Sequence, residues 1–125
     1  MSVTAEKRQI IFERQNWRCC YCGFRMYAPA KESKAQFLSA YGGSCQPTRN
    51  GRKRFLRSAR ATIEHLHRLA DGGKNTIDNL VGACGWCNSS RQEIPADSYF
   101  EEIKWLKMEG NHPLFPQPNF AHRPA

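Results

Sequence analysis

The sequence predicts a small α+β fold built around a bound metal ion. Two observations indicate the α+β class. Residues 61–92 read as strand, turn, strand and helix, and helical patterns lie on both sides of them. A third observation, two C-x-x-C cysteine pairs, points to a metal ion that stabilises the fold. Because 125 residues suffice for one small core, we expect a single domain over residues 1–125.

Residues 1–23 are expected to form a helix and then the first cysteine turn. The stretch TAEKRQIIFERQN consists largely of good helix formers, and Thr4 is suited to cap its start. Trp17 can pack under the cysteine turn, and Gly23 permits the tight backbone that such a turn requires.

Residues 24–60 are the least periodic region, and we expect a basic insertion there. AKESKAQFLSAYGG is weakly helical, whereas QPTRNGRKRFLRSAR is rich in charge and turn formers. No acidic residue occurs between Ser33 and Ile63, so a solvated loop anchored by Phe55 and Leu56 is one expectation. The other is a surface that positions phosphates, with contacts from Arg49, Arg52, Lys53, Arg54, Arg57 and Arg60.

Residues 61–92 carry the strand, turn, strand and helix pattern. Residues 61–69 contain β-branched and apolar residues, DGGKN predicts a turn, and NLVGAC predicts a returning strand. A helix is expected to begin near Cys87.

Residues 93–125 should form an amphipathic helix and a proline-rich tail. Asp97 or Ser98 would cap the helix, and Gly110 would end it. Its inward side chains would be Phe100, Ile103 and either Leu106 or Trp105. In the extended tail, Leu114, Phe115 or Phe120 could pack on the core, and His112 and His122 are expected on the surface.

Charge and hydropathy narrow the choice of partner and compartment. The net charge of +8 favours a polyanion, with nucleic acid the leading candidate. No apolar run approaches the ~18 residues that span a bilayer, and the first residues lack the apolar core of a signal peptide. We therefore expect an intracellular, cytoplasmic protein with no membrane partner.

The cysteine pairs Cys19–Cys22 and Cys84–Cys87 have the spacing of zinc ligands. Closing the long loop between the pairs costs about 4 kcal/mol, whereas structural zinc contributes about 10–16 kcal/mol in small domains. A disulfide or a redox motif is the alternative, and a reducing compartment disfavours the disulfide. Four sulfur ligands leave no position for water, so this zinc would be structural. Cys20 and Cys45 are expected to be buried or free thiols.

An acid, a histidine and an asparagine lie close to the second pair. A neutral imidazole can take a proton from water, which suits His65, and carboxylate and amide oxygens bind Mg²⁺ or Mn²⁺, which suits Glu64 with Asn88. Such a cation could stabilise charge on a phosphodiester. Neighbouring residues on a strand point to opposite faces, so Glu64 and His65 share one site only if the strand ends or twists there.

The segments NWRCCYCG and TIEHLHRLADGGKNTIDNLVGACGWCNSSR resemble the HNH endonucleases, also called His-Me finger or ββα-metal nucleases. The resemblance covers about two fifths of the chain. It implies a ββα-metal core over residues 61–92 and metal-dependent hydrolysis of DNA, by nicking or double-strand cleavage. It also implies that His65 is the general base, that Asn79 stiffens the hairpin and orients the base, and that Asn88 binds the catalytic metal. His67 matches a second histidine that contacts the scissile phosphate in some members.

Two positions depart from the family pattern. Glu64 is one methylene longer than the usual Asp and can reach the metal differently, and Arg68 replaces a common proline and can add a phosphate contact. His67 could instead only support the base, and Asn79 could be a plain turn residue.

The sequence is also compatible with other functions of the whole chain. One is a non-catalytic zinc module that binds nucleic acid or protein. Another is a nuclease subunit, prokaryotic or phage-encoded, that acts only with a packaging or restriction partner. RNA as the substrate and a homodimer are also left open.

Overall fold

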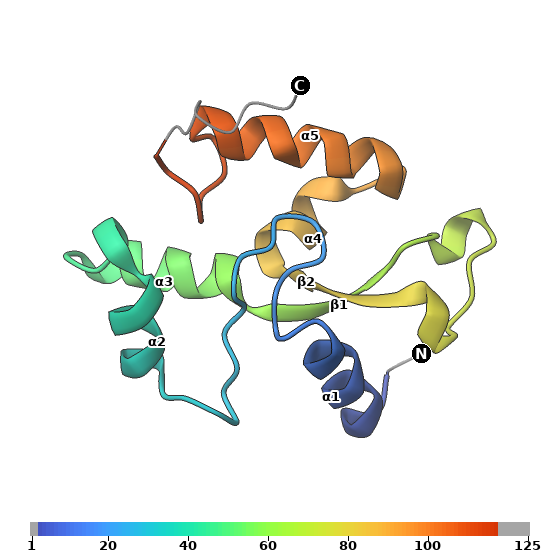
Figure 1. Ribbon diagram of the computed structural model, residues 1–125, viewed down its shortest axis with the longest axis horizontal. Coiled ribbons are helices and arrows are strands. Elements are labelled where there is room, and N and C mark those ends of the chain that lie inside the picture. The colour runs from blue at the N-terminus through green and yellow to red at the C-terminus, as the bar shows by residue number, and fades with distance from the viewer. Residues whose placement is uncertain (1–2, 118–125) are drawn as a thin grey trace.

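The computed structural model describes residues 3–117 and confirms a small α+β fold with helices on both sides of a two-stranded sheet (Figure 1). Short 3₁₀ turns lie at η1 (Gly43–Cys45), η2 (Leu69–Asp71) and η3 (Ile77–Asn79). The main elements are α1 (Ala5–Arg14), α2 (Lys34–Tyr41), α3 (Arg49–Ala59), β1 (Ala61–His65), β2 (Leu80–Cys84), α4 (Gly85–Arg91) and α5 (Ala96–Glu109).

The antiparallel strands β1 and β2 and the helix α4 form the centre of the fold. Ala61 pairs with Cys84 and His65 with Leu80, so the ladder continues to the last residue of β1. β2 passes directly into α4, where the Cys84 sulfur accepts a hydrogen bond from the Cys87 amide at 3.4 Å. The expected strand, turn, strand and helix order is confirmed, with the helix beginning slightly earlier than Cys87.

Helix α1 packs against β2, on the side of the sheet opposite to α5 (Figure 1). Thr4 caps α1 as expected, accepting a hydrogen bond from the Lys7 amide at 3.2 Å. Gly82 lets the helix approach, because a Cβ there would lie 2.8 Å from the ring of Phe12. The Gln15 amide both donates to and accepts from the backbone of Gly82. The first cysteine turn, which follows α1, is therefore fixed beside the sheet.

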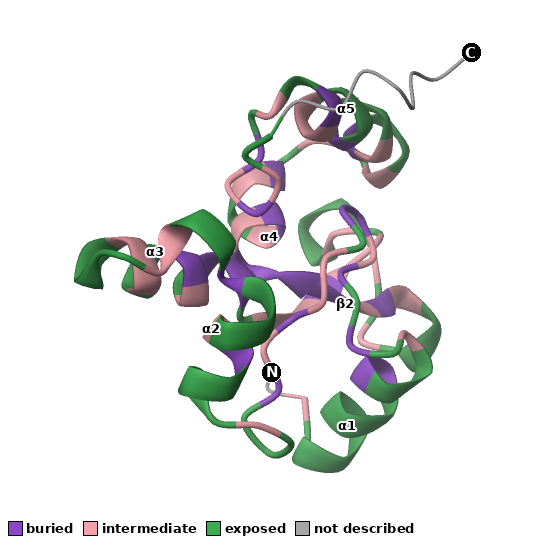
Figure 2. Ribbon diagram, turned by 60° about the vertical axis from the view of Figure 1, so that its left-hand side comes forward, coloured by how far each residue is buried: buried purple, intermediate pink, exposed green. Residues whose placement is uncertain are grey.

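The basic segment 49–59 is a helix and not a solvated loop, which corrects that expectation. Thr48 caps it by accepting a hydrogen bond from the Gly51 amide at 2.9 Å. Phe55, Ser58 and Ala59 recur at helical spacing and are buried, while most of the charged residues stay exposed (Figure 2). The expectation that Phe55 anchors the segment is confirmed. The weak helical pattern before it corresponds to α2.

Helix α5 follows Pro95 and ends at Gly110, whose φ of +76° suits glycine. Its N-cap is Pro95 and not Asp97 or Ser98, and no side chain caps it. Ile103 points inward as expected, but Trp105 is 48 % exposed. The buried positions missed by the pattern are Tyr99 and Met108.

The segment after α5 returns to the core. Leu114 is buried as expected and Phe115 packs on the core, whereas Phe120 and His122 lie outside the described residues. His112, expected on the surface, is fully buried. Contacts with the Cys87 sulfur, the Trp86 ring and the Leu114 amide hold it in the core. Within residues 3–117, none of the helices combines the length and apolar character needed to cross a membrane.

Candidate active site and metal centre

The four paired cysteines meet in the core. Their sulfur atoms lie within 4.8 Å of one another, and all four residues are buried. Cys19 and Cys22 come from the turn after α1, and Cys84 and Cys87 from the junction of β2 and α4. The chain therefore holds four cysteines positioned to bind a metal ion, as their spacing predicted. Cys20 and Cys45 are half-buried free thiols.

The protonation of the cluster supports a bound cation. Hydrogen bonds from Cys20 first, and then from the other three cysteines, lower the pKa of the Cys19 thiol. The pKa of the Cys87 thiol is raised, above all by its contact with Cys19. Thiols this close together cannot all ionise alone, because their negative charges repel in a buried site. A divalent cation removes that conflict, and four sulfur donors suit zinc.

His65 is the last residue of β1, and its ring is half-buried at the edge of the sheet. Its Nε2 lies 2.6 Å from Oδ1 of Asn75, in the loop between the strands. An amide oxygen only accepts hydrogen bonds, so the contact places the ring hydrogen on Nε2. Nδ1 is then the nitrogen that can accept a proton. The sequence motif assigned no role to Asn75. Its polar side chain in the Gly-Gly turn could have indicated a contact with the expected base.

Asn79 joins the two ends of this loop. Its Oδ1 accepts from the His67 amide at 2.8 Å, and its Nδ2 donates to the carbonyls of His67 at 2.8 Å and Lys74 at 2.9 Å. Gly73 permits the close approach, since a Cβ there would lie 1.9 Å from the His67 carbonyl oxygen. The Gly-Gly and Asn-Leu parts of the motif therefore fix the shape of the loop that carries Asn75.

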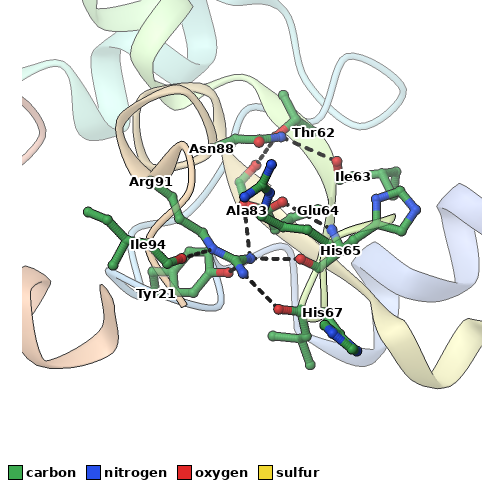
Figure 3. A network of polar contacts seen from close by, with 12 residues as sticks. Tyr21, Thr62, Ile63, Glu64, His65, His67, Ala83, Asn88, Arg91 and Ile94 are labelled. Atoms are coloured by element: carbon green, nitrogen blue, oxygen red, sulfur yellow. Dashed lines mark hydrogen bonds and ion pairs between the residues drawn. The ribbon is translucent and has the colours of Figure 1, made fainter. Parts of the chain in front are cut away.

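Glu64 points to the other side of β1 from His65 (Figure 3). Its Oε1 accepts a hydrogen bond from the His65 amide at 3.0 Å, and its Oε2 lies 3.6 Å from Arg91. Burial raises the pKa of this carboxyl group, and the neighbouring Arg91 opposes the shift. Because β1 stays paired through His65, the strand neither ends nor turns between the two residues. The structure thus keeps the two side chains apart, as strand alternation requires.

Asn88 lies on α4 beside the middle of β1. Its Nδ2 donates to Oγ1 of Thr62 at 2.9 Å and to the Ile63 carbonyl at 3.2 Å (Figure 3). The amide hydrogens are thereby used, and Oδ1 is the atom left to bind a cation. A carboxylate and an amide oxygen fit a hard ion such as Mg²⁺ or Mn²⁺. Among residues 3–117, no hydrogen bond joins the His65 ring to Glu64 or Asn88.

Arg91 organises this side of the site, although the sequence motif assigned it no role. The side chain is 2 % exposed. It donates to the carbonyls of His65, Leu66 and Ile94 and to the Tyr21 hydroxyl, at 2.7–2.8 Å (Figure 3). Arg91 follows Asn88 by three residues, which puts both on one face of α4 and was the available signal.

His67 is exposed and lines a separate open cavity of about 510 Å³ between the loop and the start of α5. Arg68 also lines it and forms an ion pair with Asp71 at 3.5 Å. The remaining lining includes Leu66, Asn79, Arg91, Pro95 and Phe100.

The proposed phosphate contacts cluster on α3. The exposed cations are Arg49, Lys53, Arg54, Arg57 and Arg60. Arg52 differs, because it is half-buried and donates to the Gln46 carbonyl at 2.5 Å. Of the exposed cations, Arg49, Lys53 and Arg57 recur every four residues and form one row along the helix.

The antiparallel hairpin, α4 and the sulfur cluster together define a small ββα domain with four cysteines positioned to hold a metal ion. Residues 48–93 match the family model described as HNH endonuclease, so this part of the chain is an HNH endonuclease domain. The matched segment includes α3, both strands, α4 and the second cysteine pair, whereas the first pair, α5 and His112 lie outside it. No curated protein matches the chain significantly. The match supports, in general terms, a nuclease-type or nucleic-acid-related function.

Proposed function

We propose that this protein is a metal-dependent endonuclease that hydrolyses DNA phosphodiester bonds, by nicking or double-strand cleavage. It would use one structural zinc ion and one catalytic Mg²⁺ or Mn²⁺ ion. The observation that carries the proposal is the position of His65 at the end of β1 in the HNH domain. Its Nε2 is hydrogen-bonded to Asn75, which leaves Nδ1 as the nitrogen that can accept a proton.

Each group has a role in this proposal. His65 takes the proton of the attacking water, and Asn75 fixes its tautomer. Asn79 holds the loop that carries Asn75, and His67 supports the base or contacts phosphate from the cavity side. Glu64 and Asn88 would hold the catalytic cation on the other side of β1 from the His65 ring, so the scissile phosphate would have to lie across the end of the strand to reach both. When bound, the cation would supply stabilisation of charge on the phosphate and on the departing oxygen. Cys19, Cys22, Cys84 and Cys87 would hold zinc.

The basic row on α3 supports DNA as the substrate. α3 leads into β1 at Ala61, at the opposite end of the strand from His65. That separation is roughly 14 Å from the rise of an extended strand, and Arg49 at the start of α3 lies farther still from His65. Arg60 and Arg68 would bind backbone phosphates near the cut, and the cations on α3 would bind phosphates farther along the DNA. The gathering of four cysteines as candidate metal ligands supports a reducing, cytoplasmic location, where spaced pairs more often bind metal than form disulfides.

One observation favours a second candidate, a zinc-stabilised module that binds nucleic acid or protein without cutting it. The Glu64 carboxylate is buried and forms an ion pair with Arg91. A cation bound by Glu64 would therefore share this carboxylate with the Arg91 guanidinium. If that pairing excludes the catalytic ion, the domain would bind but not cleave. A third arrangement, cleavage only with a second copy or a partner subunit, would also leave the isolated chain inactive.

A plasmid assay separates these functions. Supercoiled DNA is incubated with the chain and Mg²⁺ or Mn²⁺, and nicked and linear products are quantified, with RNA as a parallel substrate. The proposal expects metal-dependent cleavage that His65→Ala lowers by a factor of about 100 or more, because general-base catalysis contributes roughly that much. Lys104→Gln on the exposed face of α5 is the matched control and should cut normally. Equal cutting by His65→Ala would rule out this mechanism. DNA binding without cleavage would favour the non-catalytic module or the partner-dependent subunit over a nuclease that acts alone.

A further inference from the structure

We propose that His112 donates a hydrogen bond to the sulfur of Cys87 and thereby helps to retain the metal ion of the cysteine cluster. This inference rests on the zinc site proposed above. His112 lies beyond α5 and outside residues 48–93, so it is an addition to the HNH domain from the C-terminal part of the chain.

The hydrogen-bonding pattern of the ring fixes which nitrogen carries the hydrogen. Nδ1 of His112 accepts a hydrogen bond from the Leu114 amide at 3.1 Å, so Nδ1 has no hydrogen in the neutral ring. The hydrogen is therefore on Nε2. Nε2 lies 3.3 Å from Sγ of Cys87, within range for an N–H group that donates to sulfur. The imidazole is thus a hydrogen-bond donor to the cysteine cluster and not a fifth metal ligand.

Packing holds the ring in this orientation. Its centroid lies 4.4 Å from the Trp86 ring and 5.4 Å from the Phe115 ring. His112 also pairs with Phe115 through the backbone, and Leu114 is buried. His112 itself has no exposed surface. Burying an N–H group without a hydrogen-bond partner costs folding free energy. The hydrogen bond to the Cys87 sulfur offsets this cost for the Nε2–H group of His112.

The charge of the centre explains what the donor would do. Four thiolates around Zn²⁺ leave a net negative charge in the core, where water cannot solvate it. Hydrogen-bond donors offset that charge. The Cys87 amide donates to the Cys84 sulfur, and His112 donates to the Cys87 sulfur. Lys107 adds a cation nearby, because its Nζ donates to the Cys22 carbonyl at 2.7 Å. α5 and the segment after it thus supply polar contacts to both cysteine pairs.

Zinc release tests the donor. Zinc-loaded full chains are mixed with excess chromogenic chelator, and the release rate is followed by absorbance. His112→Phe keeps an aromatic ring between Trp86 and Phe115 but removes the donor. His112→Gln replaces the ring with an amide that can still donate. Because outer-shell partners typically contribute ten- to a hundredfold to metal affinity, we expect release from His112→Phe to be about ten- to a hundredfold faster than from the wild type. His112→Gln should recover most of the difference.

Two results would overturn the inference, and each differs from a failure of the zinc assignment. Release from His112→Phe at the wild-type rate would show that the donor has no effect. Equal, fast release from both variants would show that packing alone matters. A wild-type chain that neither contains nor takes up zinc would instead remove the zinc proposal itself, and the His112 inference with it.

A measurement on the unmutated chain covers the case in which His112→Phe does not fold. With ¹¹³Cd in place of zinc and ¹⁵N-labelled protein, the hydrogen on Nε2 of His112 should show a scalar coupling to the metal through the Cys87 sulfur. Nitrogen shifts should identify Nδ1 as the unprotonated nitrogen. A hydrogen found on Nδ1 instead would contradict the inference directly.

Discussion

Asn75 is the single side chain that hydrogen-bonds to Nε2 of His65 in the described part of the chain. Changing Asn75 to Ala removes that acceptor and lets the ring rotate, so we expect the single-turnover rate to fall roughly ten- to a hundredfold. KM should stay close to the wild-type value, since Asn75 acts on the base and not on the DNA. Asn75→Asp keeps an acceptor oxygen and should retain most of the rate. A change in KM alone would assign Asn75 to substrate binding.

Glu64 links metal binding to pH. Burial raises its pKa above the usual 4.5. At a pH between 4.5 and the raised pKa, the folded chain therefore keeps a proton on the Glu64 carboxyl group that the unfolded chain has lost. A cation binds only the ionised carboxylate, and Mn²⁺ affinity should therefore fall as the pH drops through the raised pKa. Titration calorimetry across this range checks the trend. Glu64→Gln, which cannot ionise, should bind Mn²⁺ weakly and with little pH dependence over the same range.

At the scale of elements, Arg91 connects α4 to the end of β1. Replacing it with Gln leaves three backbone carbonyls and the buried Glu64 without their partner. Breaking a buried charge pair in this way typically costs about 3–5 kcal/mol, and we expect a loss of that order in urea unfolding. Glu101→Gln, which breaks an exposed ion pair on α5, is the control and should change little. A small effect of the Arg91 change would mean that water replaces its contacts.

Helix α3 is the element expected to contact DNA. Changing Arg49, Lys53 and Arg57 to Gln removes the exposed row while keeping the buried face of the helix intact. Binding should weaken, and the slope of log K against log salt should become shallower by up to about 0.9 for each lost phosphate contact. Fluorescence anisotropy over a salt series measures both. Arg52→Gln should have a smaller effect, because Arg52 already donates to the Gln46 carbonyl. An unchanged slope would exclude α3 from the interface.

Local patterns predicted most of the elements, and the exceptions have physical causes. α1, the hairpin and α5 follow from capping residues, glycine turns and spacing of apolar residues, all of which act within a few positions. α3 was not predicted, because Gly51 and the seven basic residues between positions 34 and 60 give this region a composition typical of a loop. Burial of Phe55 and Ala59 stabilises the helix in the folded protein. Pro95 displaced the expected cap of α5.

For the whole molecule, the metal centre should decide whether the chain folds. The cysteine sulfurs join segments more than sixty residues apart, and their residues belong to the main buried cluster. Removing zinc with a chelator should therefore abolish or strongly lower the cooperative thermal transition, because structural zinc contributes about 10 kcal/mol or more to small domains. Circular dichroism with and without zinc provides the test, and returning zinc should restore the transition. An unchanged melting curve after verified metal loss would show that the core folds without the ion.

Long-range contacts account for what the sequence did not predict in the site. Cys, His and Asn residues at motif spacings identified the HNH domain and the cysteine cluster. The partners that hold them, Asn75, Arg91 and His112, are joined across 10 to 26 positions by geometry that no local pattern encodes. The roles of His65, His67, Glu64, Asn79 and Asn88 stay predictions, as does a single domain over residues 1–125.

The distance along the chain between the cysteine pairs also has a consequence for biosynthesis. Cys22 leaves the ribosome well before Cys84, and at ~5–20 residues per second the delay is about 3–12 s. During that time the nascent chain presents only half of the sulfur ligands. Formation of the β1–β2 hairpin and of the four-sulfur site must therefore wait for the second pair, so an interrupted translation product would lack the proposed metal centre.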